Sequence, residues 1–81
     1  MLTHKQNKYV IRMYAMRHQG RYETEEEMRL LYEACLDIAN HNFGDTMRVL
    51  IKKLEDLEKI QKDLSPKVKQ LLVDLKEDYD F

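Results

Sequence analysis

The sequence has few of the residues that interrupt helices or cross-link a chain. Among its 81 residues are two glycines, one proline and one cysteine, and tryptophan is absent. An all-β fold needs turn residues about every 8 to 12 positions, so this composition excludes one. A single cysteine, Cys35, excludes a disulfide within the chain and a zinc site built from several cysteines of one copy. These absences leave an all-α fold as the expectation.

Long apolar segments are also missing. No run approaches the roughly 20 apolar residues that a membrane span requires, and the N-terminus lacks the apolar core of a signal peptide. At 43% hydrophobic and 36% charged residues, the chain is too apolar for a disordered tail and too charged for a membrane protein. We therefore expect a single helical domain over residues 1–81, located in the cytoplasm and not associated with a membrane.

Helical periodicity predicts a compact bundle of four helices, at about 3–18, 24–40, 45–64 and 66–79. Boundary signals support these limits. Gly20 is a C-terminal cap candidate, and Thr24 followed by Glu27 is typical of a capping box at a helix start. Asp45 is a candidate N-cap for the third helix, and Ser65 followed by Pro66 is the signature of a cap and first helical residue.

The third helix is expected to be long, about 30 Å for 20 residues. A heptad-like spacing of 3-4-3-4-3, a pattern that suits contact with another helix, is followed by Met47, Leu50, Leu54, Leu57, Gln61 and Leu64. The pattern has two interpretations, a core stripe of the bundle itself or an interface for a partner. The candidate helix-face interface consists of Met47, Leu50, Leu54, Leu57 and Leu64.

Charge is distributed unevenly along the chain. The net charge is −1, yet residues 1–22 contain five basic residues and no acid, so the remainder carries nine bases and fifteen acids. The basic residues form a candidate binding ridge, which could contact phosphates while nearby tyrosines stack on bases. Alternatively Glu23 and the run 25–27 could neutralise it. The ridge consists of Lys5, Lys8, Arg12, Arg17 and Arg21.

The junction between the second and third helices has the outline of a helix-turn-helix, with Gly44 in the turn. Against DNA binding, Asp45 near the start of the second of these helices would repel phosphate. The overall isoelectric point of about 6.3 is also far below the value above 9 that is usual for DNA-binding domains.

No constellation for catalysis is visible. The single serine, Ser65, has a capping role, Cys35 falls within an apolar stripe, and the histidines are dispersed at positions 4, 18 and 41. The pair Asp37 and His41 is too small a ligand set for a metal. We expect a non-enzymatic protein with no metal, no cofactor and no small-molecule substrate.

These observations favour a small regulatory, inhibitory or adaptor module. We expect it to act through helix faces on a protein partner, either a second copy in a homodimer or a different protein. The alternative is a nucleic-acid-binding regulator that uses the basic first helix.

Overall fold

The computed structural model describes residues 4–20, 22, 24–40 and 43–79. It consists of four helices: α1 (His4–His18), α2 (Glu25–Asn40), α3 (Phe43–Gln61) and α4 (Pro66–Tyr79). No strand occurs within these described ranges. The predicted all-α class and the number of helices are confirmed.

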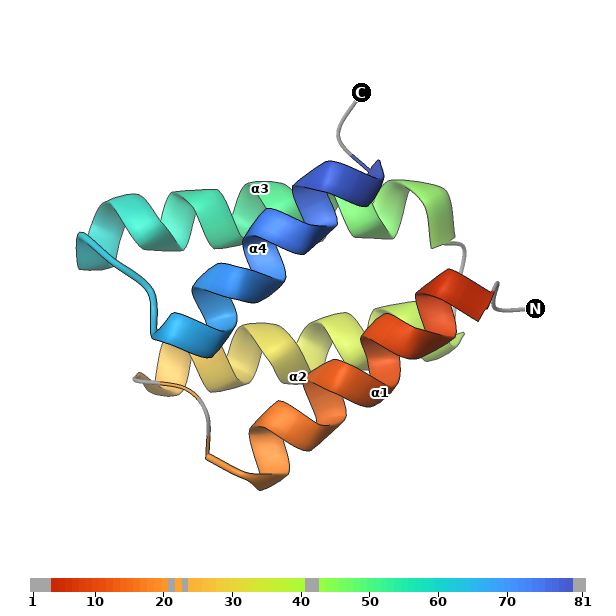
Figure 1. The fold of residues 1–81 in the computed structure, drawn as a ribbon, viewed down its shortest axis with the longest axis horizontal. Coiled ribbons are helices and arrows are strands. Elements are labelled where there is room, and N and C mark those ends of the chain that lie inside the picture. The colour runs from red at the N-terminus through yellow and green to blue at the C-terminus, as the bar shows by residue number, and fades with distance from the viewer. Residues whose placement is uncertain (1–3, 21, 23, 41–42, 80–81) are drawn as a thin grey trace.

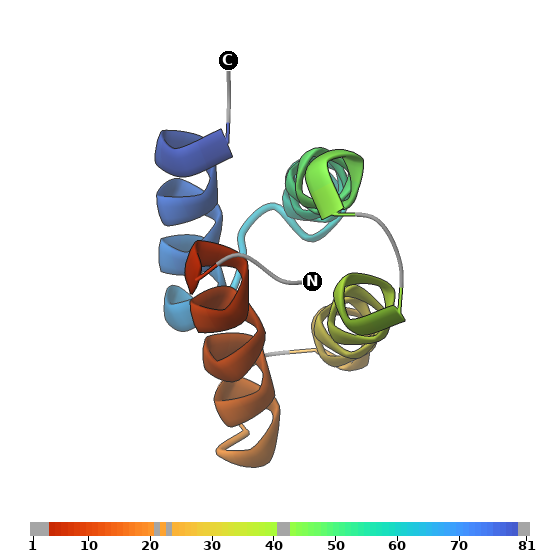
Figure 2. The ribbon, with the colours of Figure 1, turned by 90° about the vertical axis from the view of Figure 1, so that its right-hand side faces the viewer.

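The helices form two layers. α2 and α3 lie side by side and antiparallel, and α1 and α4 run across them on one side (Figure 1). The view along the α2 and α3 axes shows both layers at once, with α1 and α4 together opposite that pair (Figure 2). An antiparallel α2–α3 pair differs from the steep crossing of a helix-turn-helix, about 90–120°. The helix-turn-helix interpretation of this junction is therefore wrong.

Three of the predicted boundary signals act as expected. Gly20 has the left-handed φ of 64°, and its N–H donates to the carbonyl of Arg17 at the end of α1, as in helix caps that use glycine. The hydroxyl of Thr24 accepts the N–H of Glu27 at 3.2 Å, which makes Thr24 the N-cap of α2. The carbonyl of Ser65 accepts the N–H of Lys69 at 2.8 Å, and α4 begins at the next residue, Pro66.

The predicted limits of the third helix are wrong at both ends. α3 begins at Phe43, so Asp45 lies inside the helix and is not its N-cap. It ends at Gln61 and not at Leu64 because Lys62 takes a left-handed φ of 74°. The side chain of Asp63 then accepts the N–H of Leu64 at 2.9 Å. α3 has 19 residues, and the other three helices have 14 to 16.

One continuous core joins the two layers. Each helix contributes side chains at helical spacing, because burying one apolar stripe per helix is what makes so short a chain fold. Val10, Tyr22, Leu30, Cys35 and Tyr79 are partly buried against this core. The buried apolar residues are Tyr9, Met13, Met16, Leu31, Ala34, Ile38, Met47, Leu50, Ile51, Leu54, Leu57, Leu64, Val68, Leu71, Leu72 and Leu75.

A buried carboxyl group connects the start of α2 to the α3–α4 turn. The side chain of Glu27 is fully buried and accepts the Ser65 N–H at 2.9 Å and the Gln61 Nε2 at 3.2 Å. The Thr24 hydroxyl also donates to Gln61 Oε1 at 2.5 Å. The capping residues of α2 thus also hold the connection that leads into α4.

We expect Glu27→Ala to destabilise the fold by about 2 kcal/mol or more, because it leaves the Ser65 N–H buried without its acceptor. Urea unfolding monitored by circular dichroism measures the change. Glu26→Ala is the matched control, since Glu26 is exposed on the same helix turn, and its loss should stay below about 1 kcal/mol. Equal losses for the two variants would contradict the bridging role of Glu27.

Lys62→Gly should stabilise the fold by about 0.5 kcal/mol, since glycine adopts the left-handed conformation without the steric cost of a Cβ, partly offset by unfolded-state entropy. Lys59→Gly, at an exposed position within α3, should instead cost about 1 kcal/mol. Thermal unfolding of both variants checks the opposite signs, and a loss for both would refute the left-handed geometry at Lys62.

Candidate functional site

The basic ridge predicted on the first helix is divided by its contacts with α4. Arg12 Nη1 lies 2.6 Å from Asp74 Oδ2, and Lys5 Nζ lies 3.8 Å from Asp78 Oδ1. The Tyr9 hydroxyl donates to Asp78 Oδ2 at 2.5 Å. Two of the predicted phosphate-binding side chains therefore pair with acids on α4, which reduces the positive charge that a nucleic acid would meet.

The other ridge residues have different surroundings. Lys8 is exposed. The Arg17 guanidinium lies 4.4 Å from the centroid of the Tyr32 ring on α2, an arrangement in which a cation is attracted to the face of the ring. Arg21 lies outside the described residues, and so does Glu23, one of the glutamates expected as a neutralising group for the ridge. Lys5 and Arg12 thus pair with α4, not with the glutamates at the start of α2.

The heptad-like seam of α3 lies inside the bundle. Met47, Leu50, Leu54, Leu57 and Leu64 are all at most 8% exposed. A partner could not touch them unless the bundle opened. Of the two interpretations of this seam, the structure places all five side chains in the core stripe.

The side chains of Tyr9, Tyr79 and Cys35 have raised pKa values, and the main cause in each case is burial. Burial, followed by the hydrogen bond to Asp78, raises the pKa of Tyr9, and burial raises that of Tyr79. Burial also raises the pKa of the Cys35 thiol, which Arg17 partly opposes. The thiol donates to the Val10 carbonyl at 3.9 Å, so it contributes to the contact between α1 and α2, as a buried structural cysteine does.

Four large apolar side chains are exposed together on the outer face of α1 and α2. We call this the α1–α2 face; its members are Ile11, Tyr14, Tyr32 and Leu36, with exposed fractions of 60%, 55%, 44% and 43%. Ile11 and Tyr14 are three residues apart on α1, and Tyr32 and Leu36 are four apart on α2, so each pair shares a helix face. Sequence periodicity could not show that these four side chains would remain exposed.

The contact between Arg17 and the Tyr32 ring joins α1 to α2 at this face. The Tyr14 ring packs edge-on against His18 at 4.4 Å between centroids, and Arg17, one helical turn after Tyr14, covers the Tyr32 ring. The face is therefore apolar and aromatic, with the guanidinium of Arg17 at the α1–α2 boundary. Exposed apolar side chains on neighbouring helices are typical of protein interaction sites where they form one patch.

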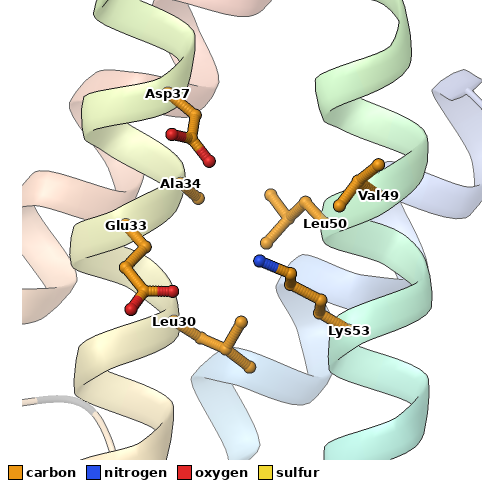
Figure 3. A pocket seen from close by; sticks show the side chains of 7 residues that line it. All are labelled: Leu30, Glu33, Ala34, Asp37, Val49, Leu50 and Lys53. Carbon is orange, nitrogen blue, oxygen red and sulfur yellow. The ribbon is translucent and has the colours of Figure 1, made fainter.

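A hollow lies between α2 and α3, with a volume of about 170 Å³. Its apolar lining comes from Leu30, Ala34, Val49 and Leu50. Figure 3 shows Glu33 and Asp37 on the α2 side, and Lys53 reaching from α3 toward Glu33. The sequence reasoning missed this hollow, because it depends on how two helices align and not on any motif.

No protein-family model, curated protein or solved structure matches this chain. The chemistry of its surfaces is therefore the basis for assigning a function. Among the described residues, no helix is long and apolar enough to cross a bilayer. The same part of the chain contains no group of three or more histidine, cysteine, aspartate or glutamate side chains arranged to hold a metal ion.

Arg12→Gln should lower stability at neutral pH by less than about 1 kcal/mol, the usual contribution of a partly exposed ion pair. The Arg12 guanidinium, together with Gln70, holds the pKa of Asp74 below its ordinary value of 3.8. The stabilisation is therefore complete above that ordinary value and is lost as the pH falls through the lower pKa of the folded state.

Thermal melts of both proteins from neutral pH to below 3.8 test this prediction. The difference between wild type and Arg12→Gln should shrink as Asp74 takes up a proton. Lys8→Gln is the control, since Lys8 is exposed on the same helix, and it should leave the melting temperature unchanged. A difference that is independent of pH would show that Arg12 does not act through Asp74.

Proposed function

We propose that this protein is a small, non-enzymatic helical binding module that docks a protein partner on its α1–α2 face. The observation that carries the proposal is the clustering of Ile11, Tyr14, Tyr32 and Leu36, each more than 40% exposed, on two adjacent helices. A chain of this size needs most of its apolar residues for folding. Apolar side chains that remain outside the core are therefore better explained by a binding role.

The face also indicates the chemistry of the partner. Tyrosine and arginine are the residue types that most often supply binding energy at protein interfaces. Arg17 lies at the boundary between the helices, and Arg29 is exposed three residues before Tyr32 on the same side of α2. The partner that fits is a protein segment that presents apolar side chains together with carboxylates.

The basic ridge gives less support to the nucleic-acid alternative. Arg12 and Lys5 are engaged by Asp74 and Asp78, and these acids place negative charge beside the helix that would approach phosphates. A phosphate-binding surface requires cations that are clustered and accessible. The proposal therefore names a protein as the ligand.

The test is an affinity capture from the native host with three baits, with and without nuclease, analysed by mass spectrometry. The wild-type bait should retain a protein. The amount of that protein captured by the double variant Tyr14→Ser/Leu36→Ser should be lower by about tenfold or more, because two interface anchors have been removed. The control bait is Val73→Ser, which removes an exposed apolar side chain from α4 and should behave as wild type.

Circular dichroism melts of the three baits establish that each is folded, which is expected because the substituted side chains are exposed. Nuclease should not change the capture. The proposal would be overturned if no captured protein distinguished the double variant from the control, or if every captured protein were released by nuclease.

A further inference from the structure

The two sides of the α2–α3 hollow carry opposite charge. The acids that line the hollow on the α2 side are Glu33 and Asp37. The lysine that lines it on the α3 side is Lys53. No ion pair joins Glu33 or Asp37 to Lys53 in the described structure. The acidic edge of the hollow on α2 thus faces its basic edge on α3, with the apolar lining between the two helices.

We propose that a second copy of this chain docks on the α2–α3 face, around a two-fold axis that lies in the interface parallel to the two helices. Rotation about this axis places the α2 of one copy over the α3 of the other. Each acidic edge then meets a basic edge, twice, because a two-fold interface repeats every contact. Charges arranged in this way select the partner and its orientation.

The other in-plane orientation is disfavoured by the same charges. A two-fold axis perpendicular to the helices would place α2 over α2 and α3 over α3. Glu33 and Asp37 would then face acids, and Lys53 would face lysines. Like charges opposed across an interface are repulsive. The charge pattern therefore discriminates between the two symmetric arrangements.

Apolar side chains on the same face provide contact area. Val49 is 48% exposed and Ile60 is 79% exposed, and their separation of 11 residues places both on one stripe of α3 with Lys53. Figure 3 shows Val49 at about the level of Ala34 across the hollow. Under the proposed symmetry, Val49 of each copy lies over the Ala34 side of the other, where the hollow can receive it.

The size of the face indicates a weak dimer. Two neighbouring helices of 16 and 19 residues cover roughly 25 by 20 Å, or about 500 Å² per copy. The pair would bury about 1,000 Å², the lower limit for a specific interface and below the standard 1,600 Å². We therefore expect dissociation in the micromolar range or above. This inference uses a different surface from the α1–α2 face and is independent of the partner bound there.

Charge reversal with sedimentation equilibrium up to about 1 mM protein tests the proposal. Lys53→Glu and Glu33→Lys should each raise the dissociation constant by about tenfold or more, since each introduces two repulsive contacts per dimer. The double variant Glu33→Lys/Lys53→Glu, and an equimolar mixture of the two single variants, should restore association to within about threefold of wild type. Both residues are exposed, so folding should be retained.

Lys67→Glu and Glu77→Lys, at exposed positions of α4, are the matched controls and should leave association unchanged. A monomer at every concentration would overturn the inference, and so would a double variant that fails to recover. Single reversals without effect would also overturn it. None of these results would affect capture through Tyr14 and Leu36, so failure of this inference is distinguishable from failure of the proposed function.

Discussion

The buried carboxyl group of Glu27 is the interaction on which the arrangement of the helices depends. Glu27 lies on the first turn of α2, and its carboxyl group accepts a hydrogen bond from the N–H of Ser65, the residue that caps α4. Because Gln61 at the end of α3 donates to the same carboxyl oxygen, three helix ends meet at one point. A buried polar group of this kind is costly unless its hydrogen bonds are made. The α3–α4 connection is therefore held in the one geometry that completes them.

From that junction α4 crosses to the layer that contains α1, and this crossing determines how the basic residues are used. Asp74 and Asp78 are far from Arg12 and Lys5 in sequence, yet they become their ion-pair partners. The charge asymmetry of the chain is thus partly neutralised within the fold. What α1 presents to other molecules is instead the combination of Ile11, apolar and exposed, with the aromatic and cationic groups beside it.

The division between core and surface also explains why two faces remain available for binding. α2 contributes to both, because it lies next to α1 on one side and α3 on the other, as Figures 1 and 2 show. On the first side it exposes Tyr32 and Leu36, and on the second Glu33 and Asp37 line the edge of a hollow. The two proposed docking faces therefore lie on different sides of α2 and do not overlap.

The helical class, the four segments and the caps at Gly20, Thr24 and Ser65 could be predicted from the sequence, because these depend on periodicity and on bonds between near neighbours. The sequence could not determine the end of α3, since the left-handed Lys62 carries no sequence signature of the kind that glycine provides. Nor could it show that Lys5 and Arg12 pair with α4, that the α3 seam is core, or which tyrosines stay exposed. These features depend on which helices become neighbours, and α1 and α4, which form the ion pairs, are at opposite ends of the chain.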